Sequence, residues 1–263
     1  MKKAVFLDID GTIMDSSKGI MNITQKVKNA IHKLQKAGNY VFIASGRPYA
    51  FISEELLNFG FDGFILTNGA NVILNDKIIY KAPISREFVK ETVKKFEELN
   101  IQYILEGEPY SYIKDSFKEF HDFYDRIQIK KTYFCGEFNL DEIDVYKMEM
   151  LYTSDKGREF CFDLLNKNKE YDYCHSIDEA LLELYARKTS KAVGIQKALE
   201  YLNIPIENSY AFGDGKNDIE MLQAVGCGIA MDNASDEVKQ YADKVTDSVE
   251  NDGVAVGIEK FIL

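Results

Sequence analysis

Three short apolar segments alternate with stretches of helical character in the first 68 residues of the chain. The apolar segments are Ala4–Leu7, "YVFIAS" at 40–45 and "DGFILTN" at 62–68. Between the first two, residues 24–38 place apolar side chains at helical spacing, from a threonine that can cap a helix to a glycine that can end it. Strands without polar alternation are typical of parallel sheets that helices cover on both faces. The pattern therefore predicts a Rossmann-like α/β core.

Two segments that flank the third strand contain residues with marked backbone preferences. Pro48 suits the first turn of a helix, and we expect that helix to run to Leu57. Residues 71–81, "NVILNDKIIYK", predict a hairpin that turns at Asn75-Asp76. Both segments would belong to the first half of the core.

A change of composition marks an insert after residue 81. From Ala82 to Glu183 the chain is richer in aromatic residues, Glu and Lys, and several of its strand-like segments alternate. The insert is expected to hold helices at 85–100 and 155–168 and strands at 102–107, 109–114, 145–153 and 180–186. The strand–helix rhythm then returns from residue 189. We predict a core of residues 1–81 and 185–263, interrupted by an α+β cap domain at 82–184.

Charge and cysteine content restrict the class of protein. A formal net charge of -11 over 263 residues argues against a nucleic-acid or anionic-membrane surface. No apolar run approaches the length of a membrane span. The four cysteines form no CxxC pair, so we interpret them as buried free thiols in a reducing cytoplasm: Cys135, Cys161, Cys174 and Cys227.

Polar residues with distinct chemistry follow the predicted core strands. In open parallel sheets, ligands bind at the carboxyl ends of the strands. The first strand leads into Asp8-Ile9-Asp10-Gly11-Thr12, the second into Ser45-Gly46-Arg47 and the third into Thr67-Asn68-Gly69. The strand at 209–214 leads into "GDGKND", and Lys191 lies in the helix that follows the insert. We therefore expect these groups to share one edge of the sheet.

Together these groups suit phosphoryl chemistry. Carboxylates that share an edge repel one another unless a cation lies between them, and hard oxygen ligands favour Mg²⁺. Lys191 supplies a positive charge and Ser45 a hydroxyl donor, while Gly11 lets the backbone turn so that its amides can face an anion. A carboxylate beside such a site can attack phosphorus, and a second, two residues later, can act as acid and then base.

In combination, "DIDGT", "SGR", a separate lysine and "GDGKND" resemble the four motifs of the haloacid dehalogenase (HAD)-like hydrolase superfamily. "LTNGA" and "AMDNA" look like the Cof-type phosphatase branch, which has a large C2-type cap. The resemblance covers both core segments, and the order and spacing of all four motifs match. It implies a Mg²⁺-dependent phosphatase with a cap domain that sets substrate specificity.

The resemblance also implies a role for each matching residue. Asp8 corresponds to the nucleophile, and Asp10 to the general acid/base whose backbone carbonyl also contacts the metal ion. The implied metal ligands are Asp8, Asp10, Asp214 and Asp218. The implied phosphate- and substrate-binding residues are Gly11, Ser45, Gly46, Arg47, Asn68, Lys191 and Asn217.

Structural roles are the competing interpretation of the same residues. D-x-D-G is good turn chemistry, and Ser45 could simply cap a helix. Asp214 and Asp218 could cap the helix that follows them, because carboxylates are favoured at helix N-termini. Capping is compatible with metal binding. Lys191 could be a solvated helix lysine, and Lys188 and Lys197 are alternatives for the functional lysine, but the position after the insert favours Lys191.

The expected activity is hydrolysis of small soluble phosphate monoesters through an aspartyl-phosphate. Sugar phosphates and phosphorylated cofactors such as flavin mononucleotide (FMN) or pyridoxal phosphate (PLP) fit the branch, and a cap of this size would exclude polymers. A phosphate-binding or phosphate-sensing protein with little turnover is one alternative, and a phosphomutase is another. Related mutases carry a helical cap between the first two motifs, whereas Thr12–Ser45 holds little beyond one helix here. No nucleic-acid or membrane partner is expected, and monomer or dimer is left open.

Overall fold

The structure is a computed structural model, and it describes residues 2–176 and 180–263. The chain divides into two compact units. The first unit consists of Met1–Gly46, Glu54–Lys81 and Ser190–Leu263, and the second of Arg47–Ser53 and Ala82–Thr189. Each unit has its own sheet and its own buried apolar cluster.

The sheet of the first unit confirms the predicted α/β fold. Within the described residues its strand order is β14-β13-β12-β1-β2-β3-β4-β5, and the pairs from β14 to β3 are parallel. The strands are β1 (Ala4–Leu7), β2 (Tyr40–Ala44), β3 (Gly63–Leu66), β4 (Asn71–Leu74), β5 (Lys77–Lys81), β12 (Ser209–Gly213), β13 (Cys227–Ala230) and β14 (Lys244–Val245). All residues of β1 and β3 are buried, as expected for strands with helices on both faces.

The predicted hairpin is confirmed and extends this sheet in the antiparallel direction. β4 pairs with both β3 and β5, and Leu74 lies opposite Lys77 across a two-residue turn. Asn75 and Asp76 have φ values of 46° and 60°. Two left-handed residues are what a type I′ turn needs, and Asn and Asp tolerate that conformation better than most residues.

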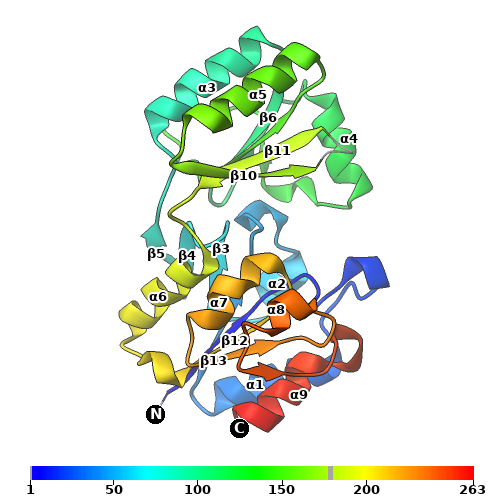
Figure 1. Ribbon diagram of the computed structural model, residues 1–263, viewed down its shortest axis with the longest axis vertical. Helices are drawn as coiled ribbons and strands as arrows, with labels where there is room; N and C mark the ends of the chain where they lie inside the picture. The colour runs from blue at the N-terminus through cyan, green and yellow to red at the C-terminus, as the bar shows by residue number, and fades with distance from the viewer. Residues whose placement is uncertain (1, 177–179) are drawn as a thin grey trace. The chain divides into compact units, whose positions relative to one another are not determined.

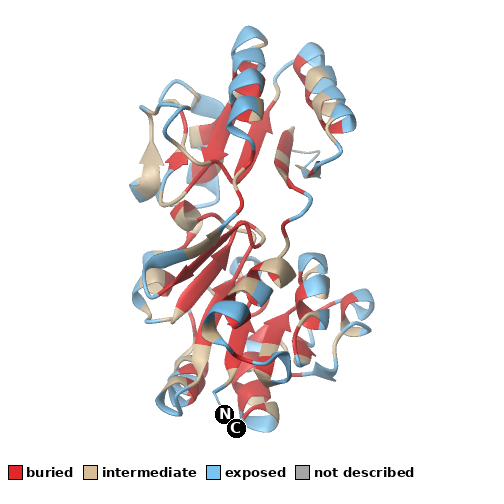
Figure 2. Ribbon diagram, turned by 90° about the vertical axis from the view of Figure 1, so that its left-hand side faces the viewer, coloured by how far each residue is buried: buried red, intermediate tan, exposed pale blue. Residues whose placement is uncertain are grey.

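Helices cover the first unit's sheet, as Figures 1 and 2 show. Phe6, Phe42 and Ile65 of the central strands pack on one face against α6 and α7. The alternate residues of β1 point to the other face, and α1 and α9 pack against each other. Thr24 caps α1 by accepting a hydrogen bond from the Val27 N–H. The helices are α1 (Gln25–Lys36), α2 (Glu54–Asn58), α6 (Lys191–Leu202), α7 (Ile219–Gln223), α8 (Asp236–Lys239) and α9 (Gly253–Phe261), with short 3-10 turns η1 (Ser16–Lys18), η5 (Ile206–Asn208), η6 (Lys216–Asp218) and η7 (Val249–Asn251).

The continuous helix expected from Pro48 to Leu57 is wrong. A 3-10 turn, η2 (Tyr49–Phe51), is followed by Ile52 in an extended conformation, and α2 begins only at Glu54. Tyr49 and Phe51 pack edge-on or tilted against aromatic rings of the second unit, which include Tyr133. The segment therefore serves two packing environments, and the change between them interrupts the helix.

The second unit is an α+β structure. Its sheet has the order β10-β11-β9-β6-β7-β8 in the described residues. One face packs on α3 and α5, and the other carries the aromatic residues Phe120 and Tyr124 of α4. The strands are β6 (Gln102–Glu106), β7 (Ser111–Tyr112), β8 (Phe134–Cys135), β9 (Lys147–Leu151), β10 (Tyr171–Ser176) and β11 (Leu181–Ala186). The helices are α3 (Arg86–Glu98), α4 (Lys118–Arg126) and α5 (Asp155–Lys167), with the 3-10 turn η3 (Lys131–Tyr133).

A charged cluster is buried on the α4 side of this second sheet. The Lys147 ammonium lies 3.3 Å from Glu106, 3.2 Å from Glu149 and 3.0 Å from Glu183. The Tyr124 hydroxyl donates a hydrogen bond to Glu149. Glu106 and Glu149 are almost fully buried, so their charges must be compensated within the cluster.

Burial affects the two glutamates differently. It raises the pKa of Glu106 well above the ordinary value of 4.5. Burial would also raise the pKa of Glu149, but the Lys147 ammonium and the hydrogen bond from the Tyr124 hydroxyl hold that pKa below its ordinary value. Glu106 therefore keeps its proton to higher pH than Glu149 does.

The pKa of Glu106 predicts a pH-dependent stability difference for Glu106→Gln. The folded protein binds the Glu106 proton more tightly than the unfolded chain does, so this group costs stability as pH rises from about 4.5 towards the folded pKa. Glutamine mimics the protonated acid. The free energy of unfolding of the variant, relative to that of the wild type, should therefore rise by up to about 1.4 kcal/mol per pH unit in that range. Urea unfolding from about pH 5 to about pH 8 measures this difference.

The control for this experiment is Glu137→Gln, at an exposed position of the same unit. Its stability relative to the wild type should change little with pH. A Glu106→Gln difference that is equally independent of pH would contradict the assignment of the proton to Glu106.

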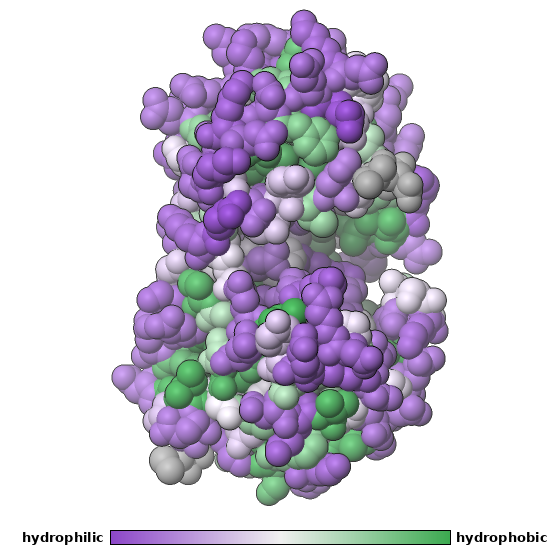
Figure 3. Space-filling model, in the orientation of Figure 1, coloured by the Kyte–Doolittle hydropathy of each residue, from purple (hydrophilic) through white to green (hydrophobic). Residues whose placement is uncertain are grey.

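In the view of Figure 3 the surface is mostly hydrophilic, with apolar side chains in small scattered patches. None of the helices in residues 2–176 and 180–263 has the length and apolar character needed to cross a membrane.

All four cysteines are free, but the expectation that all are buried is wrong, because only Cys161 is buried. Cys174 is exposed because it lies on the edge strand β10.

Candidate active site

The central strand of the first unit determines where the site lies. β1 pairs with β12 on one side and with β2 on the other, so the chain order reverses at β1. The crevice at the carboxyl ends of strands around such a reversal is where open α/β sheets bind ligands. Asp8 is the first residue after β1, and its backbone N–H donates to the Phe212 carbonyl of β12 at 3.0 Å.

A buried ammonium group joins two carboxylates at this position. The Lys191 Nζ lies 2.6 Å from Asp8 Oδ1 and 2.6 Å from Asp218 Oδ1. The Lys191 side chain is fully buried, and the two carboxylates are nearly so. Lys191 is therefore not a solvated helix lysine, and its charge is compensated inside the site.

Lys191 is held here by close packing around the first turn of α6. Ser190 caps this helix by accepting a hydrogen bond from the Val193 N–H. A Cβ atom on Gly69 would lie 2.0 Å from the Ser190 carbonyl oxygen, so only glycine lets the two segments approach this closely. Gly69 also has a φ of 84°. The "LTNGA" motif thus has a packing role in placing Lys191.

The charges at the site affect one another strongly. Burial raises the pKa of Asp8 to about 7, the Asp218 charge acts in the same direction, and Lys191 opposes both. Burial alone would lower the pKa of Lys191, but the two carboxylates outweigh it and hold that pKa above its ordinary value. Lys191 is therefore an ammonium ion at neutral pH, beside a carboxyl group whose ionisation is sensitive to added positive charge.

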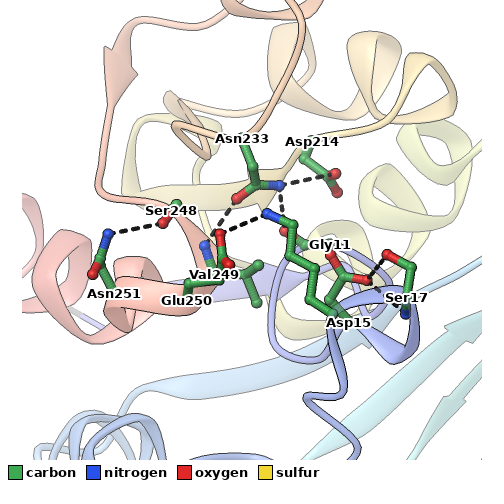
Figure 4. A network of polar contacts seen from close by, with 10 residues as sticks. Gly11, Asp15, Ser17, Asp214, Asn233, Ser248, Val249, Glu250 and Asn251 are labelled. Atoms are coloured by element: carbon green, nitrogen blue, oxygen red, sulfur yellow. Dashed lines mark hydrogen bonds and ion pairs between the residues drawn. The ribbon is translucent and has the colours of Figure 1, made fainter.

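Asp214 supplies a third carboxylate. One oxygen atom each from Asp8, Asp214 and Asp218 can be chosen so that all three lie within 4.8 Å of one another. Burial, followed by the Asp218 charge, raises the pKa of Asp214 to about 6. Its Oδ1 accepts a hydrogen bond from the Thr12 hydroxyl and its Oδ2 from the Asn233 amide, each at 3.2 Å. Figure 4 shows the second of these contacts.

Asp218 binds both Lys191 and the backbone of the loop after β12. Its Oδ2 accepts hydrogen bonds from the backbone N–H groups of Asp214, at 3.0 Å, and Gly215, at 2.9 Å. The expected capping of the helix that follows is wrong, because within the described residues the Asp218 side chain makes no cap hydrogen bond to α7 and instead binds N–H groups that precede it. With the Lys191 contact, three of the four or so lone-pair positions of this carboxylate are used. One remains for a cation or for a water molecule bound to it.

The turn after β1 is tight and depends on Gly11. The Ile9 carbonyl accepts hydrogen bonds from the N–H groups of Thr12, Ile13 and Met14. Gly11 has a φ of 82°, and a Cβ atom there would lie 2.1 Å from Asp214 Oδ2. The loop therefore needs glycine for its conformation and for the close approach of the Asp214 carboxylate.

The loops after β2 and β3 meet beside this turn. Ser45 is buried, and the Asn68 N–H donates to its carbonyl at 3.1 Å. Asn68 Oδ1 is buried without a hydrogen-bond partner among the described residues, and it would lie 3.0 Å from a Cβ atom on Gly46. Thr67 and Asn68 both have a φ of 51°. Consecutive left-handed residues other than glycine are costly and are found most often at functional sites.

For the remaining predicted residues, Asp10, Asn217 and Arg47, the structure gives their positions but no test of their roles. Asp10 is exposed in the turn, two residues beyond Asp8. Asn217 is also exposed, and its side chain lies over Gly215. Arg47 belongs to the second unit, where its guanidinium donates to the Phe51 carbonyl at 3.2 Å. The roles of these three residues stay predictions.

The donor set fits a hard divalent cation. Asp8, Asp214 and Asp218 offer only oxygen ligands, and carboxylates this close repel one another unless positive charge lies between them. Lys191 provides only part of that charge, since it contacts two of the three. Burial raises the pKa values of Asp8 and Asp214, and the neighbouring Asp218 charge acts in the same direction.

A family model for haloacid dehalogenase-like hydrolases matches residues 5–258. The chain belongs to this family. The Bacillus subtilis strain 168 protein YkrA is 32% identical to this hydrolase over 98% of this chain and 97% of its own length. The phosphatase YitU of the same strain, named for 5-amino-6-(5-phospho-D-ribitylamino)uracil, is 29% identical over 98% of this chain and 96% of its own.

Solved structures agree with this assignment. The HAD subclass IIB sugar phosphatase BT4131 superposes on this hydrolase with a TM-score of 0.77. It is 27% identical, and the match covers 99% of each chain. The resemblance to the superfamily and to its Cof-type branch, inferred from the motifs, is therefore confirmed.

Two residues of the site were not among the predicted site residues of this hydrolase. Thr12 and Asn233 both donate to Asp214. Thr12 lies inside the "DIDGT" motif, and Asn233 lies inside "AMDNA", which served only to recognise the branch. Their polarity was visible in the sequence, but their contacts with Asp214 were not. Thr12 is about 200 residues from Asp214 in the chain and Asn233 is 19 residues from it, and only the fold brings their loops together.

A matched pair of glycine variants tests the importance of the turn after β1. Gly19 also has a left-handed φ, of 74°, but a Cβ atom there would meet nothing within 4 Å. Gly19→Ala should therefore cost only the conformational strain, about 1–2 kcal/mol. Gly11→Ala should cost more and should also displace Asp214. We expect Mg²⁺ to raise the melting temperature of the Gly19→Ala protein but not of the Gly11→Ala protein.

Thermal unfolding with and without Mg²⁺ measures both effects. The geometry of the turn would be contradicted by equal Mg²⁺ stabilisation of the two variants.

Proposed function

We propose that this hydrolase cleaves small soluble phosphate monoesters in a Mg²⁺-dependent reaction through an aspartyl-phosphate on Asp8. The observation that carries the proposal is the Asp8 carboxylate at the end of the central strand, buried beside Lys191 and two further carboxylates. The broader class, a phosphoric monoester hydrolase, follows from the family and from curated relatives that are phosphatases.

In the first step, an Asp8 carboxylate oxygen attacks the phosphorus atom of the substrate. A bond forms between Asp8 and phosphorus while the bond to the alcohol oxygen breaks. Asp10 gives its proton to the departing alkoxide, for which its place in the turn after β1 is suitable. Lys191 keeps one side of the nucleophile in a fixed position, because it holds Asp8 Oδ1 at 2.6 Å.

In the second step, Asp10 is a carboxylate and takes a proton from water. The water oxygen attacks the phosphorus atom of the aspartyl-phosphate and releases inorganic phosphate, which restores the Asp8 carboxylate. The two steps therefore use Asp10 first as acid and then as base. Its exposure in the turn gives it access to water in both protonation states.

A Mg²⁺ ion would be held by Asp8, Asp214, Asp218 and the backbone carbonyl of Asp10. When bound, it supplies positive charge that stabilises the phosphoryl oxygens and keeps Asp8 ionised at neutral pH. Burial raises the pKa values of Asp8 and Asp214, and a bound cation would favour the ionised form of both carboxyl groups.

The phosphoryl group itself would be bound by groups from several loops. We assign it to the Lys191 ammonium, the Ser45 hydroxyl and the backbone amides near Gly11 and Gly46. Asn68 is assigned to the rest of the substrate, because its buried Oδ1, which has no hydrogen-bond partner among the described residues, only accepts hydrogen bonds, as phosphoryl oxygens also do. Asn217 and Arg47 complete the proposed set of binding residues.

We assign substrate choice to the cap domain at 82–184 and expect a small phosphorylated metabolite. Sugar phosphates and phosphorylated cofactors such as FMN or PLP are candidates. The solved neighbour BT4131 is a sugar phosphatase, and the relative YitU is named for a phosphorylated ribitylaminouracil, so that compound belongs on the panel. A cytoplasmic location and the absence of nucleic-acid and membrane partners stay predictions.

Release of inorganic phosphate from a panel of these monoesters tests the proposal. The wild type should release phosphate with Mg²⁺ and lose that activity with EDTA. Asp8→Asn should reduce the rate to the background of the assay, because an amide oxygen does not form the covalent intermediate. Acid quenching during turnover, followed by mass spectrometry of the Asp8 peptide, should detect the phosphorylated aspartate in the wild type only.

Asp236→Asn is the matched control, since Asp236 is an exposed aspartate of the same unit and lies in α8. It should keep the wild-type rate. Activity that survives in Asp8→Asn would overturn the nucleophile, and activity that survives metal removal would overturn the Mg²⁺ dependence. Stable binding of a phosphate compound with no turnover would favour the phosphate-sensing alternative.

A further inference from the structure

We propose that Asn233 is a positioning residue of the metal site, which orients the Asp214 carboxylate and the turn after β1 for cation binding. The inference rests on the proposed function, because it presumes the same Mg²⁺ site. It adds a residue that lies outside the four recognised motifs.

The Asn233 side chain makes three hydrogen bonds to three different segments. Its Nδ2 donates to the Gly11 carbonyl at 2.8 Å and to Asp214 Oδ2 at 3.2 Å. Its Oδ1 accepts from the Val249 N–H at 2.8 Å. Figure 4 shows Asn233 between Gly11, Asp214 and Val249. One amide group therefore connects the loops after β1, β12 and β14.

These partners allow only one orientation of the amide. The two groups near Nδ2 are a carbonyl oxygen and a carboxylate oxygen, which are both acceptors, and the group near Oδ1 is a donor. If the amide were rotated by half a turn, oxygen would face oxygen twice and an N–H would face an N–H. Asn233 is thus matched to its surroundings in a way that neither aspartate nor leucine, both of similar size, would be.

The contact with Asp214 has a specific consequence for a cation. Thr12 donates to Oδ1 and Asn233 to Oδ2, so both oxygens of the carboxylate are held from the protein side. Each oxygen keeps a further lone pair, which is free to face a metal ion. Donors arranged in this way fix the plane of the carboxylate before the ion arrives.

The contact with Gly11 extends this effect to the other side of the site. The Gly11 carbonyl is one peptide unit beyond the Asp10 carbonyl, which the proposed function places on the metal ion. By holding the Gly11 carbonyl, Asn233 restrains the Gly11–Thr12 peptide plane, which is the next one along the chain from the plane that carries the Asp10 carbonyl. The same amide therefore links one proposed ligand, Asp214, to the loop that carries another, the Asp10 carbonyl.

Asn233 can restrain these loops because it is itself anchored. It lies in a turn between β13 and α8, and the flanking Met231 N–H donates to the Gly213 carbonyl at 3.0 Å. The loop that contains Val249 is tied to the turn after β1 by an ion pair of 2.7 Å between Lys18 and Glu250. A purely structural role in joining loops is the competing explanation, and it predicts a loss of stability without a loss of metal affinity.

Calorimetric titration with Mg²⁺ separates the two explanations, because it needs no substrate. Loss of a residue that orients a metal ligand typically weakens metal binding by about 10- to 100-fold. We expect Asn233→Ala to weaken Mg²⁺ binding by a factor in that range, measured well below the unfolding temperature of each protein. The Mg²⁺ concentration for half-maximal phosphate release should rise by a similar factor.

Asn251→Ala is the matched control. Asn251 is exposed in the same group of loops, and its Nδ2 donates to the Ser248 hydroxyl. Its replacement should leave Mg²⁺ affinity unchanged. Asn233→Ser provides a second variant should the alanine protein fail to fold, since serine suits turns and its hydroxyl is too short to reach both Gly11 and Asp214.

The Mg²⁺ titration separates a failure of the Asn233 inference from a failure of the proposed function. Wild-type Mg²⁺ affinity in Asn233→Ala or Asn233→Ser, with or without lowered stability, would overturn the role of Asn233 and leave the proposed function intact. A wild type that binds no Mg²⁺ would overturn both. A loss of affinity in the Asn233 variants but not in Asn251→Ala would support the inference.

Discussion

The active site depends on one buried ammonium group, Lys191, between the carboxylates of Asp8 and Asp218. Burying a charge this deeply is costly unless partners compensate it, and removal of one partner from a buried pair typically costs about 3–5 kcal/mol. The rest of the first unit provides the conditions for this arrangement. β1 places Asp8, the loop after β12 places Asp218, and Gly69 lets α6 approach closely enough to deliver Lys191. The residues to which we assign phosphoryl chemistry are therefore also residues on which the folded state depends.

A second buried charged cluster, in the other unit, follows the same physical rule without the same chemistry. Lys147 is surrounded by three glutamates, as Lys191 is by aspartates, but the excess negative charge is relieved by a proton on Glu106. In the active site, burial raises the pKa values of Asp8 and Asp214, and a divalent cation bound there would lower them again. The two clusters show that one lysine does not balance three acidic groups, and that a proton or a metal ion can supply the remaining charge.

Much of this arrangement could be predicted from the sequence, because it follows from local patterns. Unbroken apolar strands such as Ala4–Leu7 predict a parallel sheet, and Asn75-Asp76 predicts a tight hairpin turn; both are confirmed. The break at Ile52 was not predicted, because it results from packing of Tyr49 and Phe51 on rings far away in the chain. Asn233 was missed for the same reason. Its polar side chain is unremarkable until the loops that carry Gly11, Asp214 and Val249 are brought together.

The position of β12 has a consequence for how the protein is made. The central strand β1 takes one of its neighbours, β2, from nearby sequence, but its other neighbour begins at Ser209, after the whole of the second unit. During synthesis β1 would therefore have an unpaired edge until that late segment emerges, and contacts between such distant segments form slowly. Asp8 and Lys191 are 183 residues apart, so the Asp8 carboxylate gains its ammonium partner only after most of the chain has been made. A nascent chain of this kind lacks the complete site, and it exposes one edge of its central strand for most of its synthesis.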